Sequence, residues 1–252
     1  MFADYPQAGQ IPQLRLLWQE AFGDTDAFLD NFFTSGYSPD RCRAVTLEGQ
    51  TAAALYWFDC VWEEKKLAYL YAVATAEAFR GRGLCRFLLE DTHKLLAQQG
   101  YAGAVLSPGS RSLFQMYEKL GYRVMSSIRE FSREADAAPY PVTEVTPEEY
   151  ARRRALLLPE GGIRQEGESL RFLTTYASLF AAEDCLLCVR REKDTLFAAE
   201  LLGNADRAGG IVRYFGCREG IFRTPGDGKA FAMYCPLIQE RAMPTYLGHA
   251  FD

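Results

Sequence analysis

Residues 67–85, LAYLYAVATAEAFRGRGLC, place an apolar run, a short connection and an Arg-Gly-Arg-Gly turn in succession. The apolar run at residues 67–75 predicts a buried strand. After the turn, apolar residues recur with a 3.6-residue period and predict an amphipathic helix. Its apolar positions are Leu84, Phe87, Leu88, Leu95 and Leu96. A strand, a glycine-rich turn and a helix therefore follow one another here.

The turn at residues 80–83 has the composition of an anion-binding site. The first backbone N–H groups of a helix have no intrahelical partner, and the helix dipole adds partial positive charge there. Gly81 and Gly83 have no side chain to hold a phosphate away from the backbone. Arg80 and Arg82 add full positive charges. We predict that this turn binds a pyrophosphate.

Two common phosphate loops do not fit the sequence. No GxxxxGK[ST] string occurs, and a dinucleotide-binding GxGxxG pattern has Arg86 in place of its third glycine. The turn resembles instead the Arg-x-x-Gly-x-Gly/Ala coenzyme A loop of the GNAT acyltransferase superfamily. Arg80, Gly83 and Cys85 stand at its three defined positions. Cys85 departs from the usual glycine or alanine but is also small.

A second motif follows in the order of that superfamily. Gly100 is a candidate helix C-cap, and residues 102–106 predict another strand. Residues 108–122, PGSRSLFQMYEKLGY, resemble the second GNAT signature, a short helix that ends in Tyr-Glu-Lys-x-Gly-Phe/Tyr. Residues 1 to about 132 are therefore identified as similar to a GNAT domain. Residues 73–75 (Val-Ala-Thr) and Pro108 resemble the Eis-like branch more closely.

The resemblance implies an α/β (α+β) fold with a mixed, mostly antiparallel central sheet flanked by helices. It also implies a second, smaller lobe that is a degenerate GNAT-like copy. We expect a catalytic acetyl-CoA-binding domain at residues 1–134 and the degenerate domain at residues 142–252. The stretch 134–141, with two prolines, is the expected linker. No Arg-x-x-Gly-x-Gly loop follows in the second half, so we expect no coenzyme site there.

Periodicity and turn residues predict the remaining elements. In the first half we expect helices at residues 11–22 and 26–33, which in a GNAT domain lie over the acceptor cleft, and strands at 42–47, 51–60 and 125–133. In the second half, Thr146 is an N-cap and begins a helix to about residue 158. We expect a further helix at 169–181 and strands at 185–190, 196–202 and 211–215.

Composition limits the classes of partner. The 252-residue chain has a formal net charge of −5, which argues against nucleic acid or an anionic membrane and fits a cationic amine. No apolar stretch reaches about 18 residues, and residues 1–5 do not resemble a signal peptide. Seven scattered cysteines predict reduced thiols in a cytoplasmic protein. We expect a monomer or a homodimer.

The resemblance also implies how the residues act. In GNAT enzymes an amine attacks the thioester of acetyl-CoA directly, without a covalent enzyme intermediate. By resemblance, the Val73 backbone N–H stabilises the oxyanion and the Tyr117 hydroxyl protonates the leaving thiolate. The alternative for Tyr117 is a tyrosine that caps a core. The expected coenzyme-binding residues are Val73, Ala74, Thr75, Arg80, Gly81, Arg82, Gly83, Leu84 and Cys85.

Several residue types leave alternatives open. The candidate general bases are Glu63, Glu64, Tyr69, Tyr71 and the C-terminal carboxylate of Asp252. Eis-like enzymes use a terminal carboxylate as base, although a frayed terminus is the commoner outcome for a chain end.

We expect His93 to be solvated. Cys185 and Cys188 would face opposite sides of a strand, so we interpret them as core residues and expect no metal.

Three functions remain open from the sequence. The first is an N-acetyltransferase that uses acetyl-CoA on a small amine or an aminoglycoside-like acceptor. The second is a regulatory module that binds coenzyme A without turnover. The third is an acetyltransferase acting on a protein lysine or N-terminus, which would need an open groove in place of a closed pocket.

Overall fold

The computed structural model describes residues 2–239 and 242–251. Its strands are β1 (Cys42–Leu47), β2 (Gln50–Trp62), β3 (Lys65–Thr75), β4 (Gly103–Leu106), β5 (Arg123–Glu134), β6 (Thr143–Glu144), β7 (Arg164–Gln165), β8 (Ser178–Ala181), β9 (Cys185–Glu192), β10 (Thr195–Gly203), β11 (Glu219–Pro225) and β12 (Lys229–Pro236). Its α-helices are α1 (Ile11–Phe22), α2 (Asp26–Ser35), α3 (Leu84–Gln98), α4 (Arg111–Glu118), α5 (Pro147–Leu157), α6 (Glu168–Leu173) and α7 (Ala208–Tyr214). Four 3-10 turns lie at Ala8–Gln10, Pro39–Arg41, Glu77–Phe79 and Ala205–Arg207.

One mixed sheet runs through the molecule. Its strand order is β1-β2-β3-β4-β12-β5-β11-β10-β9-β8-β6, and β7 pairs with β2 beside this path. The β3–β4 and β10–β11 pairs are parallel, and the other pairs are antiparallel. The predicted fold class, a mostly antiparallel sheet flanked by helices, is confirmed.

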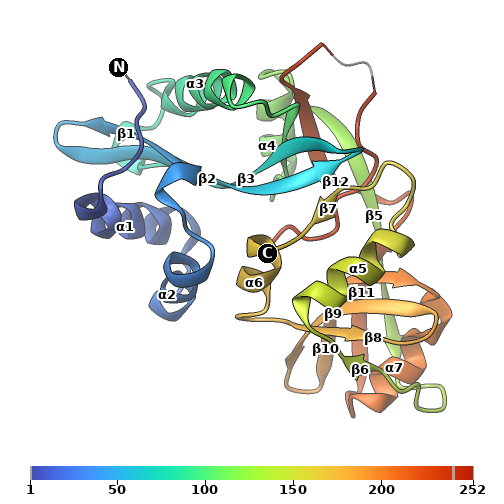
Figure 1. Ribbon diagram of the computed structural model, residues 1–252. Coiled ribbons are helices and arrows are strands. Elements are labelled where there is room, and N and C mark those ends of the chain that lie inside the picture. Colours follow the sequence, from blue (N-terminus) through green and yellow to red (C-terminus); the bar gives the residue numbers. More distant parts are fainter. Residues whose placement is uncertain (1, 240–241, 252) are drawn as a thin grey trace.

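Both halves of the chain repeat one order of elements (Figure 1). The first lobe has α1, α2, β1, β2, β3, α3 and β4; the second has α5, α6, β8, β9, β10, α7 and β11. In each lobe a helix connects two parallel strands, β3 to β4 and β10 to β11. The second helix of this kind has 7 residues where the first has 15. The second lobe is thus a reduced copy of the first.

Two strands join the lobes. β5 pairs with β12 from Arg123 to Ile128 and with β11 from Ile128 to Glu134. β12 lies between β4 and β5, so a strand from the range expected for the second domain completes the sheet of the first. The division into residues 1–134 and 142–252 stays a prediction. Strands β11 and β12 of the second range pair with β5 and β4 of the first, so the sheet is continuous across this boundary.

Helices cover both faces of the first lobe because β2 alternates its large side chains (Figure 1). Tyr56 and Phe58 pack in the core cluster that contains α1 and α2, whereas Leu55 and Trp57 pack in the cluster that contains α3. The first cluster continues into the second lobe and includes Cys188, whereas Cys185 belongs to a third cluster. The prediction that these two cysteines are core residues on opposite sides of a strand is confirmed.

Two expected elements of the second half are wrong. The expected strand at residues 211–215 is part of α7, whose buried Ala208, Ile211 and Val212 have helical spacing that a short apolar run conceals. The expected helix at 169–181 ends at Leu173, as α6. Two adjacent threonines follow, which favour helices weakly, and the chain then extends into β8.

Other general properties concern membranes and thiols. None of the described helices is long and apolar enough to cross a membrane. All seven cysteines lie in the described ranges, and none of them forms a disulfide.

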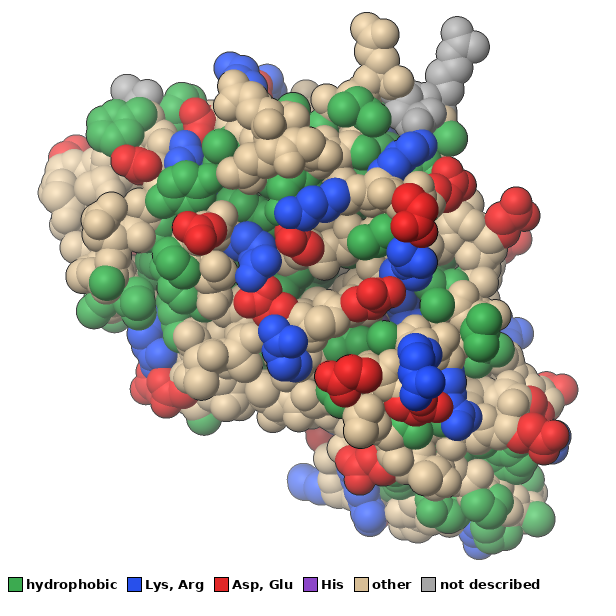
Figure 2. All heavy atoms as spheres, viewed as in Figure 1, with side chains coloured by type: hydrophobic (Ala, Val, Ile, Leu, Met, Phe, Trp, Pro, Cys, Tyr) green, Lys and Arg blue, Asp and Glu red, His purple; other side chains and the backbone are tan. Residues whose placement is uncertain are grey.

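Positive and negative side chains are interspersed over the face of the molecule in Figure 2. This face therefore lacks the extended basic field that nucleic-acid binding needs.

His93 is not the solvated residue that we expected. It is largely buried on α3, and its Nε2 lies 2.7 Å from the Tyr122 hydroxyl oxygen. Burial lowers the pKa of His93 from about 6.5 to about 4. The His93 ring also packs against the ring of Tyr122, with centroids 5.5 Å apart, a contact that sequence periodicity alone does not reveal.

We expect the stability of the protein to fall between pH 6.5 and 4 because of His93. The folded-state pKa is depressed, so the unfolded chain takes up the proton first as the pH falls. The contribution is fully present above pH 6.5 and decreases toward pH 4. Urea unfolding at pH 7.5 and 4.5 should show a loss about 2 kcal/mol larger in the wild type than in His93→Gln. Equal losses in both proteins would contradict the burial effect.

Candidate active site

The loop before α3 has an open face with exposed glycines. Gly81 and Gly83 have φ angles of +76° and +77°, a region that L side chains rarely adopt. A Cβ atom at either position would meet no heavy atom within 4 Å. Gly83 is the N-cap of α3, and no side chain caps this end. The first N–H groups of α3 therefore border open space where an anion fits.

The two arginines of the loop donate hydrogen bonds to nearby backbone carbonyl oxygens. Arg80 Nε donates to the Thr75 carbonyl oxygen at 3.2 Å, and Arg82 Nη2 donates to the Ala78 carbonyl oxygen at 3.3 Å. Both side chains thereby stay beside the start of α3. A groove of about 290 Å³ runs along the loop. Six of the predicted coenzyme-binding residues line it: Thr75, Arg80, Gly81, Gly83, Leu84 and Cys85.

A larger cavity opens where β3 and β4 part. These parallel strands pair only from Leu67–Gly103 to Tyr69–Val105. Beyond that point β3 continues for six residues to Thr75, paired with β2 but no longer with β4. The divergence leaves a cavity of about 500 Å³, lined on one side by residues 70–73 of β3 and on the other by residues 106–109. A pantetheine chain can enter such a gap as an additional strand.

A β-bulge shapes the wall of this cavity. Ala74 pairs with Ala54 and Tyr71 with Tyr56, so two residues of β3 oppose one residue of β2. Ala72, inside the bulge, has a φ of +48°. A bulge bends its strand and redirects the backbone groups around it. Ala72 and Val73 consequently line the cavity, and Val73 is the residue whose backbone N–H is the predicted oxyanion donor.

Tyr117 of α4 lines the same cavity and is buried. Burial raises the pKa of Tyr117 above its usual value, so the hydroxyl holds its proton at neutral pH. Val73 and Tyr117 are thus brought together, next to the groove of the glycine-rich loop. Ala74 is buried, and Arg82 lies outside both linings.

The candidate bases separate into two groups. Glu63 and Glu64 are exposed in the β2–β3 turn and line neither space. Tyr69 and Tyr71 line the cavity, where their hydroxyls donate to the carbonyl oxygens of Ala250 (2.6 Å) and Phe251 (3.1 Å). Asp252 lies outside the described residues. Residues 246–249 and Phe251 are buried, so the alternative of a frayed tail does not hold for them.

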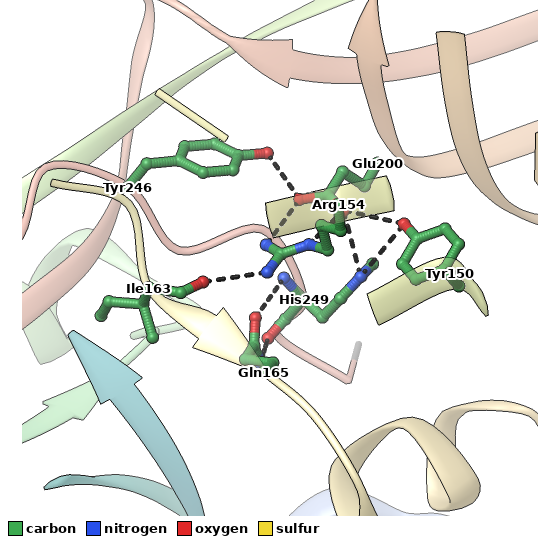
Figure 3. Close-up of polar contacts among 7 residues, drawn as sticks. All are labelled: Tyr150, Arg154, Ile163, Gln165, Glu200, Tyr246 and His249. Atoms are coloured by element: carbon green, nitrogen blue, oxygen red, sulfur yellow. Dashed lines mark hydrogen bonds and ion pairs between the residues drawn. The ribbon is translucent and has the colours of Figure 1, made fainter. Parts of the chain in front are cut away.

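A buried polar network anchors this tail (Figure 3). Glu200 of β10 accepts from Arg154 Nε at 2.7 Å and Nη2 at 2.8 Å, and His249 Nε2 lies 3.1 Å from the same carboxylate. Burial alone would raise the pKa of Glu200, but Arg154 and His249 outweigh it and hold the pKa well below its usual value. Tyr150 and Tyr246 also donate to Glu200.

The tail passes this network closely. A Cβ at Gly248 would lie 1.7 Å from Glu200 Oε1, so only glycine fits. The side-chain amide of Gln165 in β7 donates through its nitrogen to the His249 carbonyl oxygen and accepts through its oxygen from the His249 backbone N–H. The sequence reasoning missed the network. Its signal was Glu200 within the apolar run LFAAELL, since a buried carboxylate needs a cationic partner.

In the second lobe, the start of α7 corresponds to the open loop before α3, but here protein atoms occupy the space. A Cβ at Gly209, near the start of α7, would lie 2.1 Å from Asp136 Oδ1, and one at Gly210 would lie 2.6 Å from the Ala138 carbonyl oxygen. The segment between the lobes thus covers the α7 terminus. Within residues 2–239 and 242–251, no three His, Cys, Asp or Glu side chains are grouped as metal ligands would be.

Comparisons with known proteins give a domain match for the first lobe and a shared fold for the chain. A family profile described as an acetyltransferase (GNAT) domain matches residues 4–125. A GCN5-related N-acetyltransferase from Kribbella flavida is 16% identical, with a TM-score of 0.70 over 92% of this chain and 70% of that chain. Eis1 from Mycobacterium abscessus is 12% identical, with a TM-score of 0.69 over 94% of this chain and 74% of its own.

A chain of similar length also shares the fold. The GCN5-related N-acetyltransferase from Sphaerobacter thermophilus is 15% identical, with a TM-score of 0.55 over 97% of this chain and 98% of that chain. Among curated proteins, no sequence match was found. Residues 4–125 thus match a GNAT acetyltransferase domain, and the chain shares its fold with these solved structures over more than nine-tenths of its length.

Proposed function

We propose that the chain is an N-acetyltransferase that moves an acetyl group from acetyl-CoA to a primary amine. One observation carries the proposal: a single strand, β3, borders both the groove of the glycine-rich loop and the cavity that contains Tyr117. Pyrophosphate bound at the loop would direct the pantetheine arm along residues 73–75 toward Tyr117. The thioester would then lie in the cavity beside Val73.

The reaction needs three proton transfers and one group transfer. The ammonium group of the acceptor loses a proton to a base, and the free amine attacks the thioester carbonyl carbon. The new C–N bond forms as the C–S bond breaks, and the departing thiolate takes a proton from Tyr117. The nitrogen releases its second proton as the amide forms, which restores Tyr117 through solvent. Overall, ammonium and acetyl-CoA give amide, free thiol and one proton.

Two groups that line the cavity support these roles, one as a hydrogen-bond donor and one as a proton donor. The backbone N–H of Val73, in the bulge, is the proposed donor to the oxyanion. Burial raises the pKa of Tyr117, so its hydroxyl stays protonated at the pH of the reaction and has a proton to give to the leaving thiolate. The acetyl group is already activated as a thioester, so orientation of the two substrates supplies much of the remaining rate.

The cavity favours a small acceptor over a protein segment. The hydroxyls of Tyr69 and Tyr71 hold the backbone of Ala250 and Phe251 against β3, and Phe28 of α2 lines the same cavity. The tail and α2 thereby restrict the acceptor side of the cavity. A peptide would need a longer open groove.

Acetyl-CoA binding at the loop tests the proposal. At a hundredfold excess over its Kd, acetyl-CoA should raise the unfolding free energy by about 2.7 kcal/mol. Gly83→Asp should abolish this increase because it places an anion in the pyrophosphate position. Gly216→Asp is the matched control: Gly216 is also exposed, has a φ of +64° and has room for a Cβ with no atom within 4 Å, but lies after α7. An unchanged increase in Gly83→Asp would overturn the assignment of the loop.

A further inference from the structure

The acceptor side of the cavity is built from aromatic rings. They come from α1, α2, β3, the segment after α6 and the tail: Trp18, Phe22, Phe28, Tyr71, Tyr176 and Phe251. The rings contact one another around the cavity. Centroid distances are 5.4 Å for Trp18–Tyr71, 5.7 Å for Phe28–Tyr176 and 5.6 Å for Tyr71–Phe251. Such a lining offers π faces to a cation and apolar contact to a ring.

Charge is scarce in this lining and is balanced. Among the described residues, one carboxylate, Asp24, and one guanidinium, Arg190, line the cavity. Trp18 Nε1 donates to Asp24 Oδ2 at 2.8 Å, which fixes the carboxylate beside an indole ring and leaves Oδ1 for another donor. Arg190 forms an ion pair with Glu192, with Nε 3.3 Å from Oε1.

We infer that the acceptor is a monoamine with an aromatic body, bound through its ammonium group by Asp24 and through its body by the rings. The inference rests on the proposed N-acetyltransferase function and specifies the acceptor of that same site. A single ammonium matches the single carboxylate. The aromatic body then replaces water against the ring faces, which contributes apolar burial and aromatic contact.

A polycation fits this cavity poorly. Each further ammonium group would leave water without a carboxylate to pair with, and this desolvation is unfavourable. Arg190 would also repel a second positive charge inside the cavity. The restricted volume of about 500 Å³ must hold the acetyl end of the donor as well as the acceptor. The net charge of −5 attracts cations in general, but it does not provide the carboxylates at this site.

Calorimetric titration of amines into the protein with coenzyme A present tests the inference without turnover. The probes are 2-phenylethylamine, with one charge and one ring, and spermidine, with three charges and no ring. We expect 2-phenylethylamine to bind at least tenfold more tightly. The same titrations without coenzyme A separate the acceptor site from the coenzyme site.

Two variants with matched controls locate the contacts. Asp24→Asn keeps an oxygen for Trp18 but removes the charge, and should weaken 2-phenylethylamine binding at least tenfold. Asp26→Asn, in a neighbouring side chain that is 79% exposed, should not. Phe22→Leu removes a ring that is 47% exposed, so folding is preserved, and should weaken binding a few-fold. Phe33→Leu, on α2 outside the lining, should leave binding unchanged.

Each outcome decides one of the two claims. Spermidine binding as tight as or tighter than 2-phenylethylamine overturns the monoamine inference and leaves the acetyltransferase proposal standing. Equal affinities in Asp24→Asn and Asp26→Asn overturn the role of Asp24. Acetyl-CoA that fails to bind overturns the proposed function, and the titrations without coenzyme A then still decide between the two amines.

Discussion

Replacing Tyr117 with phenylalanine is expected to lower kcat by about 100-fold or more and to leave acetyl-CoA binding unchanged. The substitution removes only a hydroxyl, and the buried ring keeps its packing. A proton donor to the leaving thiolate acts only as the C–S bond breaks, so the loss appears in kcat and not in KM. Steady-state rates of thiol release over a range of amine concentrations measure this directly.

The control for Tyr117 is its neighbour Tyr122. The two rings lie 5.5 Å apart, and Tyr122 is also buried, but its hydroxyl contacts His93 and does not line the cavity. Tyr122→Phe should cost roughly 1 kcal/mol of stability and leave kcat nearly unchanged. The loss in Tyr117→Phe should shrink with a thioester whose leaving thiol is more acidic. Full activity of Tyr117→Phe would remove this residue from the mechanism.

Replacing Glu200 with glutamine is expected to lower the unfolding free energy by about 3–5 kcal/mol. The change leaves the guanidinium of Arg154 buried without a negative partner, although its size is nearly conserved. The double variant Arg154→Met with Glu200→Gln should be less destabilised than Glu200→Gln alone, because it removes the unpaired charge. Chemical denaturation of the three proteins at pH 7 measures the differences.

An exposed ion pair serves as the control. Glu130 lies 3.0 Å from Arg223, and its side chain is 43% exposed. Glu130→Gln should change stability by less than about 1 kcal/mol because water screens the pair. The pKa of Glu200 is depressed, so its contribution is present above the unfolded pKa and is lost as the pH falls through the folded pKa. A loss in Glu200→Gln no larger than in Glu130→Gln would contradict the structural role of the network.

The first lobe could be predicted largely from sequence because its signals are local. A buried strand, a glycine-rich turn and an amphipathic helix follow within residues 67–98, and the structure has β3, the open loop and α3 there. The positive φ angles of Gly81 and Gly83 explain why glycine is needed twice. The positions of Val73 and Tyr117 in one cavity agree with their predicted roles, which stay predictions.

The second lobe and the acceptor side were less predictable because they depend on distant contacts. α7 is a short helix whose apolar run also suited a strand. The insertion of β12 between β4 and β5 brings together residues more than a hundred positions apart, and no local pattern specifies it. Likewise, the contact between Glu200 and Gly248 exists only once the tail has folded back across the cleft. Tertiary packing decides each of these features.

The most direct test of the central claim is to incubate the protein with acetyl-CoA and a panel of primary amines and to measure two products together. Free thiol is followed by its absorbance after chemical labelling, and the acetylated amine by mass spectrometry. We expect thiol release that depends on the amine and equals the amide formed, and that falls about 100-fold in Tyr117→Phe. Binding of coenzyme A with no amide from any amine would contradict the account and support a regulatory module.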